Sequence, residues 1–143
     1  MISFSGTEPF PHPPVVVAGR LFDAGWLAAA LPDTTVVSAA QDRAVWTVKP
    51  QFAFAKGTLE TTAEVENRTP SSAEYRLAIK GVGAGASVVA KLAIAEAEGG
   101  SAVSWTAEVT ELTGLLKLVP KGLIQAAAQK VIADAWAALR EKV

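Results

Sequence analysis

The last stretch of the chain carries the clearest pattern of apolar and polar positions. Between Leu115 and Lys142 the apolar residues recur at intervals of three and four, which predicts one long amphipathic helix. At 1.5 Å per residue, about 28 residues span about 40 Å, so the apolar side of this helix needs a large partner. The apolar stripe consists of Leu116, Leu123, Ile124, Ala127, Ala128, Val131, Ile132, Ala135, Trp136 and Leu139.

The region before this helix shows the two-residue alternation of β-strands with one buried face. Together with a short first strand, it predicts six or seven antiparallel strands. Gly99-Gly100 is expected to form a tight hairpin, and Pro50 indicates a bulge or an edge position. The expected strands are 2–7, 35–39, 43–55, 57–66, 73–82, 87–96 and 102–112.

Two short helices are expected after the first strand. Pro14 suits the first turn of a helix that runs to Leu21. Asp23 is a suitable N-cap for a second helix over 24–31, which Pro32 ends. The sequence therefore predicts an α+β fold in which a curved antiparallel sheet grips a long C-terminal helix. Folds of this kind often leave a cavity between sheet and helix.

The inward faces of the predicted strands carry no charged residue. The simplest interpretation is an ordinary hydrophobic core. The alternative is a hydrophobic pocket, since the inward alanines opposite an alanine-rich helix can leave volume unfilled. A ligand in such a pocket would be apolar, and its expected contacts are Trp46, Phe52, Phe54, Tyr75, Leu77, Leu92, Trp105, Leu123 and Ala127.

The composition narrows the class of protein. The 143 residues suffice for one domain, expected over 1–143. A net charge of −1, with acids and bases interspersed, lacks the basic face that nucleic-acid binding normally needs. The chain has no cysteine, which excludes disulfides and cysteine-ligated metal. It shows neither a signal peptide nor an apolar run of about 18 residues, so we expect a cytoplasmic protein without a membrane-spanning segment.

Groups suited to catalysis are scarce. The one histidine, His12, lies among prolines and is expected to be solvated. The glycine-rich segment 81–86 precedes a strand and not a helix, which favours a hairpin over a phosphate loop. Tyr75 could donate a hydrogen bond to a ligand carbonyl, although a backbone partner in the core is the more usual arrangement. We therefore expect no catalytic residue, no metal and no cofactor.

Three lysines on the terminal helix allow two interpretations. They are Lys117, Lys121 and Lys130, of which Lys121 and Lys130 lie largely outside its apolar stripe. A solvated helix face is the simpler interpretation. The alternative is contact with an acidic partner or with lipid headgroups, which leaves peripheral membrane contact open.

Several motifs, taken in order, resemble those of one family over nearly the whole chain. They are Ser5-Gly6 with the proline-rich segment after it, Asp23-Ala24-Gly25-Trp26-Leu27-Ala28-Ala29-Ala30-Leu31-Pro32-Asp33, Ala55-Lys56-Gly57-Thr58, Tyr75-Arg76-Leu77 with Gly81-Val82-Gly83, and the helix from Leu123 to Leu139. The chain thereby resembles the CoxG family of carbon monoxide dehydrogenase subunits, which is part of the START-like (SRPBCC) helix-grip superfamily. The resemblance implies a hydrophobic cavity under the terminal helix and a single START-like domain.

The resemblance and the residues together suggest three functional hypotheses. The first is non-enzymatic binding of a hydrophobic small molecule, with a lipid or a quinone as candidates. The second, implied by the resemblance alone, is an accessory or membrane-recruitment factor for a molybdenum hydroxylase of the carbon monoxide dehydrogenase type. The third is an enzyme of the cyclase or hydrolase kind found elsewhere in the superfamily. The lack of an inward acid or histidine argues against this third hypothesis.

Overall fold

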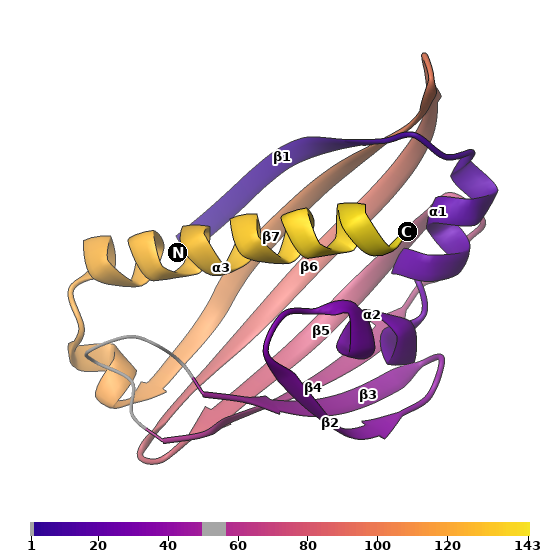
Figure 1. Cartoon of the computed structure of the whole chain (residues 1–143). Coiled ribbons are helices and arrows are strands. Elements are labelled where there is room, and N and C mark those ends of the chain that lie inside the picture. Colours follow the sequence, from indigo (N-terminus) through magenta and orange to yellow (C-terminus); the bar gives the residue numbers. More distant parts are fainter. Residues whose placement is uncertain (1, 50–56) are drawn as a thin grey trace.

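The computed structural model describes residues 2–49 and 57–143 of the chain. Over these residues it forms a seven-stranded antiparallel sheet with helices on one face, called here the helix-covered face (Figure 1). The strand order is β1-β7-β6-β5-β4-β3-β2, which leaves β1 and β2 at the two edges. The strands are β1 (Ile2–Phe10), β2 (Thr34–Ala39), β3 (Arg43–Val48), β4 (Leu59–Glu66), β5 (Ser72–Gly81), β6 (Ala84–Ala97) and β7 (Gly100–Gly114). The helices are α1 (Pro14–Leu21), α2 (Ala24–Ala30), the short 3₁₀ helix η1 (Leu115–Leu118) and α3 (Lys121–Lys142).

The predicted architecture is confirmed, and the strands differ from the prediction mainly at their ends. The strands β6 and β7 are longer than expected, and Gly99 and Gly100 connect them with positive φ angles of 79° and 154°. At the sheet edge, β1 continues through Pro9 to Phe10, because an edge strand tolerates a residue without an N–H group. Most of the part of the predicted strand 43–55 that follows Val48 lies outside the described residues.

The terminal helix begins later than its apolar pattern predicted. The prediction of one helix from Leu115 is wrong, since η1 ends at Leu118 and α3 starts only at Lys121. Pro120 occupies the N-cap position of α3. The residue before a proline is pushed out of the helical region, and Val119 accordingly has φ −78° and ψ 133°. Leu116, counted in the predicted stripe, therefore belongs to η1.

The apolar stripe of α3 is only partly buried. Ile124, Trp136 and Leu139 are buried, whereas Leu123 and Val131 are more than half exposed. For these two residues the prediction of a buried stripe is wrong. The stripe is wider than the part of the helix that meets the rest of the protein, since α3 makes its main backbone contacts with β1 and α2.

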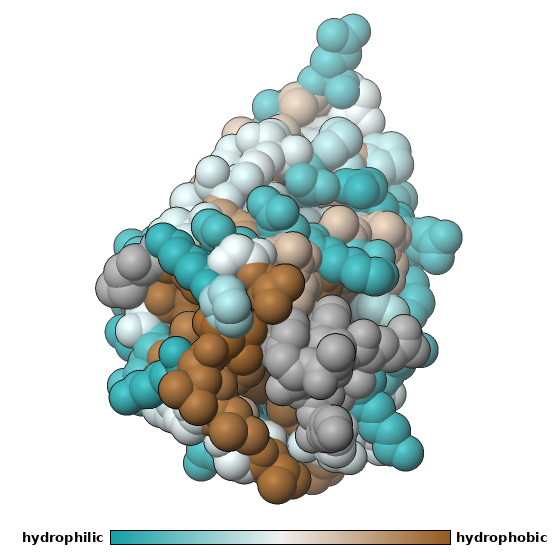
Figure 2. Space-filling view, turned by 90° about the vertical axis from the view of Figure 1, so that its left-hand side faces the viewer, coloured by the Kyte–Doolittle hydropathy of each residue, from teal (hydrophilic) through white to brown (hydrophobic). Residues whose placement is uncertain are grey.

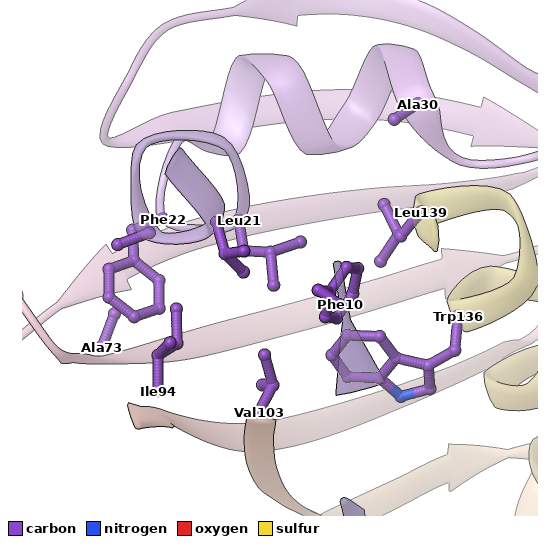
Figure 3. Packing of buried hydrophobic residues seen from close by; sticks show 11 residues of the cluster. Phe10, Leu21, Phe22, Ala30, Ala73, Ile94, Val103, Trp136 and Leu139 are labelled. Carbon is purple, nitrogen blue, oxygen red and sulfur yellow. The ribbon is translucent and has the colours of Figure 1, made fainter. Parts of the chain in front are cut away.

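The largest hydrophobic cluster combines residues of α1 and of the C-terminal half of α3 with residues of the sheet (Figure 3). Phe10 from β1 meets Trp136 from α3 edge to face, with ring centroids 6.1 Å apart. Trp105 from β7 lies 5.9 Å from the same indole. Lys142 adds a hydrogen bond of 2.8 Å from its Nζ to the carbonyl of Ala30 in α2. The C-terminal half of α3 is thus firmly packed.

The two short helices are held by local and long-range hydrogen bonds. Asp23 caps α2 as expected, because its Oδ1 accepts a hydrogen bond of 3.1 Å from the N–H of Trp26. Arg68, in the turn before β5, donates from Nη2 and Nε to the carbonyl of Phe22 at 2.8 and 3.1 Å. Its Nη1 lies 2.6 Å from Oδ1 of Asp42. Arg68 therefore ties the junction of α1 and α2 to the turn between β2 and β3.

Candidate functional site

Small side chains occupy the middle of the helix-covered face. One row in register across five strands runs from Val65 through Tyr75, Ala90 and Ala107 to Phe4. The two alanines lie on β6 and β7, between the larger side chains at either end of the row. A surface of this kind gives little bulk to fill the space towards α3.

Apolar residues of the central strands on this face stay partly accessible. Val65, Leu77, Ala90 and Leu92 pack against a buried cluster but are themselves only half-buried. They lie on β4, β5 and β6, whereas α3 makes its main backbone contacts with β1 and α2. The described residues thus leave apolar sheet surface on the side that faces α3.

A first open groove of about 440 Å³ lies between β1 and the C-terminal half of α3. Its apolar wall comes from aromatic and aliphatic side chains of β1, β7 and α3, and its polar wall includes an ion pair between Glu8 and Arg140. Its volume is within the range of small-molecule sites, about 300–1,000 Å³. The groove is lined by Ser3, Phe4, Ser5, Glu8, Trp105, Gln129, Ile132, Ala133, Trp136 and Arg140.

A second open groove of about 450 Å³ lies where β7 meets η1 and the start of α3. Its lining is mainly aliphatic, with two lysines and one glutamate among the polar residues. Like the first groove, it is lined by residues of β1, β7 and α3. The second groove is lined by Ile2, Val109, Thr110, Glu111, Leu112, Leu116, Lys117, Val119 and Lys121.

The structure separates the predicted pocket residues into several places. Trp46 and Tyr75 are buried in one cluster, with Leu77 and Leu92 packed against it. Trp105 is half-buried and lines the first groove. On α3, Ala127 is half-buried and Leu123 is exposed. Two further residues, Phe52 and Phe54, lie outside the described residues.

The hydroxyl of Tyr75 is engaged within the protein. It donates a hydrogen bond of 2.6 Å to the carbonyl oxygen of Leu21, in buried surroundings. Burial raises the pKa of Tyr75 well above its usual value of 10, the charge of Asp23 raises that pKa further, and Arg68 lowers it. The alternative of a backbone partner is thus confirmed, and the proton of this hydroxyl is not free for a ligand.

Glu8 is a site residue that the sequence analysis did not identify. It lies on the inward side of β1, and its side chain is only 19% exposed. Oε1 accepts a hydrogen bond from Nη1 of Arg140, and Oε2 lies 3.4 Å from the indole nitrogen of Trp105. The alternation through Ile2 and Phe4 contained the signal, because continuing it for four more residues places Glu8 inward.

Three further features bear on the kind of site. Among the described residues, no group of three histidine, cysteine, aspartate or glutamate side chains is arranged to hold a metal ion. His12 is half-buried, and its backbone carbonyl accepts a hydrogen bond of 2.6 Å from Ser101 Oγ. None of the helices in the described part of the chain is long and apolar enough to cross a membrane.

The chain is similar to a known protein family in sequence and to solved proteins in structure. A family model for CoxG, a subunit of carbon monoxide dehydrogenase, matches residues 6–143. A conserved protein from Geobacillus kaustophilus has a similar structure, with a TM-score of 0.85 at 13% identity, covering 99% of this chain and 94% of that one. A START superfamily protein from Mycobacterium smegmatis has a TM-score of 0.70 at 11% identity, covering 99% and 96%. A comparison with curated sequences found no match.

Proposed function

Because the chain belongs to the CoxG family of carbon monoxide dehydrogenase subunits and has a START-like fold, we propose that it is a non-enzymatic protein that binds a hydrophobic small molecule. The ligand is lipid-like or quinone-like and lies between the sheet and α3. We propose that the protein acts in the cytoplasm. The observation that carries this proposal is the partly accessible apolar surface of β4, β5 and β6 on the side that faces α3.

The unequal packing of α3 supports the proposal. Trp136 and Leu139 fix its C-terminal half, whereas in its first half Ile124 is the buried residue. An apolar molecule that covers Leu77 and Leu92 would remove their apolar surface from water. Each Å² of apolar surface that is buried in this way contributes about 25 cal/mol of favourable free energy. That gain favours filling the space with a ligand. The proposed contacts are Trp46, Phe52, Phe54, Tyr75, Leu77, Leu92, Trp105, Leu123 and Ala127.

The state of the inward polar groups supports a role without catalysis. Glu8 is paired with Arg140, and the Tyr75 hydroxyl is bound to a backbone carbonyl. A general acid or base needs a proton that it can exchange with the substrate. These two groups instead fix one element of the fold against another. Selectivity then depends on the shape and apolar character of the space.

Native mass spectrometry of the protein purified from its own host tests the proposal directly. A stoichiometric adduct that organic solvent extracts as a lipid or quinone is the expected result. An adduct-free protein that no member of a lipid and quinone panel stabilises against heat would overturn the proposal.

A matched pair of variants tests the location of the ligand. Ala127 is half-buried on α3, and its neighbour Ala126 is exposed. Ala127→Trp fills the space towards the sheet and is expected to lower ligand affinity, whereas Ala126→Trp points to solvent and leaves affinity unchanged. Equal affinities in both folded variants would show that the ligand lies elsewhere.

Membership of the family favours a second candidate function. As an accessory factor, the protein would bind a molybdenum hydroxylase of the carbon monoxide dehydrogenase type and recruit it to the membrane. Affinity purification of the tagged protein from its native host is expected to recover such an enzyme. Recovery of the tagged protein alone, from cells that express the hydroxylase, would contradict this candidate.

A further inference from the structure

The two edges of the sheet differ in how they are protected from pairing with another strand. On β2, a register shift between Val36 and Ser38 interrupts the ladder with β3, and a bulge of this kind disturbs the row of free backbone groups at an edge. The ladder between β1 and β7 runs without a shift from Ile2 to Phe10. β1 contains no lysine or arginine, and its one proline comes only at position 9. The edge of β1 is therefore open to another strand.

The direction of the backbone groups shows which residues of β1 face its free edge. A Cβ atom added at Gly100 in β7 would meet the carbonyl oxygen of Phe10, so the backbone of Phe10 is directed towards β7. In a strand, the N–H and C=O groups of one residue point to one side and those of the next residue to the other. Pro9, which has no N–H group, accordingly faces the free edge, as prolines in edge strands do.

Three hydroxyl-bearing residues share this free edge. The alternation directs the backbone groups of Ser3, Ser5 and Thr7 away from β7. In the described part of the chain, no backbone hydrogen bond from outside the strands reaches these groups, and the three residues are exposed. Figure 2 shows a mainly white to teal surface at the height of β1 in Figure 1, above a hydrophobic patch. The edge thus offers backbone hydrogen bonds to a partner strand, with no charge among these three residues.

We propose that two copies of the chain form a dimer through their β1 strands, which pair antiparallel about a twofold axis at Ser5. This register sets Ser5 opposite Ser5 of the second copy and Ser3 opposite Thr7, so the free N–H and C=O groups of these residues gain partners. A register shifted to set Ser3 opposite Pro9 would lose a donor in each copy. Pairing of β1 with β1 closes at two copies, whereas pairing of β1 with β2 would add copies without limit.

The side chains on both faces of the sheet fit this register. On the helix-covered face, Phe4, which is half-buried, lies opposite Gly6 of the second copy. Trp105 already lies over Gly6, since two of its indole atoms are 3.0 Å from the position of a Cβ atom there. Phe4 of each copy therefore meets Trp105 of the other, an aromatic contact that the twofold axis repeats. On the opposite face, serine lies opposite threonine, a cross-strand pair that forms hydrogen bonds without charge repulsion.

The first groove borders this interface. Ser3 and Ser5 belong to its lining together with Gln129 and Ala133, which are exposed on α3. Because the side chains of the two serines lie on the other face of the sheet, the groove reaches these residues at the free edge. The second copy therefore closes the groove on that side, and Gln129 and Ala133 bring no charge that would have to lose its water. The dimer requires no ligand between the sheet and α3, so it goes beyond the proposed function.

Sedimentation equilibrium of the full chain at several concentrations tests the pairing, and we expect a monomer–dimer equilibrium. Ser5→Pro removes the central N–H donor of each copy and is expected to raise the Kd of the dimer about 30-fold, since two hydrogen bonds are lost. Ser5→Lys sets like charges opposite one another and is expected to raise it about fivefold. Ser104 is exposed on β7 opposite Thr7, one strand in from the edge, so Ser104→Lys is a matched control that should dimerise like the wild type.

Disulfide cross-linking tests the register. The chain has no cysteine, so an introduced thiol reports its own position alone. The Cα atoms of a hydrogen-bonded antiparallel pair lie about 5.5 Å apart, within the range that a disulfide spans. With oxidised glutathione as the oxidant, Ser5→Cys is expected to give a covalent dimer on a non-reducing gel, and Ser104→Cys is expected to stay monomeric there.

Several results would overturn the pairing. They are a chain that sediments as a monomer at every soluble concentration, equal cross-linking of Ser5→Cys and Ser104→Cys, and a dimer that Val37→Lys on β2 dissociates while Ser5→Lys leaves it intact. If Ser5→Pro proves unfolded by circular dichroism, Ser5→Lys and the cross-linking provide the same test. A monomer that carries an extractable apolar ligand would overturn the pairing alone, and the proposed function would stand in that case.

Discussion

Arg140 in the last turns of α3 donates a hydrogen bond from Nη1 to Oε1 of Glu8 on β1, with the two atoms 2.5 Å apart. The pair joins positions 132 residues apart and fastens the C-terminal half of the helix to the edge of the sheet. The other carboxylate oxygen lies 3.4 Å from the indole nitrogen of Trp105. One acidic residue thus connects β1, β7 and α3.

Removing Glu8 should lower the free energy of unfolding more than removing Arg140. Glu8→Ala leaves two donors without their acceptor and is expected to cost about 1–2 kcal/mol. Arg140 is 39% exposed, so Arg140→Ala is expected to cost less, about 0.5 kcal/mol. Urea unfolding of the two single variants and of the double variant measures the interaction free energy between the two side chains. Strictly additive losses would show that the pair contributes nothing.

Replacing Tyr75 by phenylalanine should destabilise the protein. The change removes the hydrogen bond of 2.6 Å to Leu21 and leaves that buried carbonyl without its donor. The expected loss in the free energy of unfolding is about 1–2 kcal/mol, measured by urea denaturation. An unchanged stability would mean that water replaces the hydroxyl at this carbonyl.

Tyr75 should also make the fold sensitive to alkali. Its pKa in the folded protein lies above the usual value of 10, because burial disfavours the phenolate. A raised pKa favours the fold below pH about 10, and this contribution is lost as pH rises above that value. Tyr75 is the only tyrosine, so ultraviolet absorbance of tyrosinate reports this residue alone. We expect phenolate to appear together with unfolding, and titration near pH 10 in the folded protein would contradict this.

Gly6 is required because it lies opposite Trp105 on the neighbouring strand. A Cβ atom at Gly6 would lie 3.0 Å from two atoms of the indole. Gly6→Ala is therefore expected to lower the free energy of unfolding by about 1–3 kcal/mol through overpacking. Gly19 in α1 is a matched control, since nothing lies within 4 Å of a Cβ atom there.

Gly19→Ala should have the opposite effect. Alanine is the better helix former, so this variant is expected to gain about 0.5–1 kcal/mol. Thermal melts of the two alanine variants make the comparison. Similar effects of both changes would show that the indole moves aside at no cost.

Arg68 should not tolerate replacement by lysine. Two of its nitrogens donate to the carbonyl of Phe22, and a lysine ammonium cannot reproduce this planar geometry. Arg68→Lys is expected to cost about 1–2 kcal/mol of the free energy of unfolding. Arg76 pairs with Glu66 on the surface, and Arg76→Lys should leave the melting temperature unchanged. Equal melting temperatures for both variants would contradict the assigned role of Arg68.

The sequence predicted the elements of the fold because their signals are local. Alternation gave the strands, and Asp23 and Gly99 marked a helix start and a hairpin. It also predicted that Tyr75 points inward, which its burial confirms. The start of α3 was wrong by six residues, since the apolar repeat continued through Pro120 although a proline and the residue before it resist the helical conformation there.

For the candidate site, the sequence predicted that the surface is apolar but not which residues line the grooves. The residues predicted an apolar surface between sheet and helix, and Leu77 and Leu92 are half-buried on the helix-covered face. The position of Leu123 on the outer side of α3 was not predictable, because the stripe was wide enough to face the sheet at several rotations of the helix. The lining by Phe4 and Glu8 depends in the same way on where α3 crosses β1.

The sequence by itself determined the order and type of the elements, the apolar character of the inward faces and the family, because each is encoded in short-range repeats and motifs. Only the tertiary structure decided which half of α3 is firmly packed and where the two grooves lie. These properties depend on the packing of segments such as β1 and α3, which lie more than 100 residues apart.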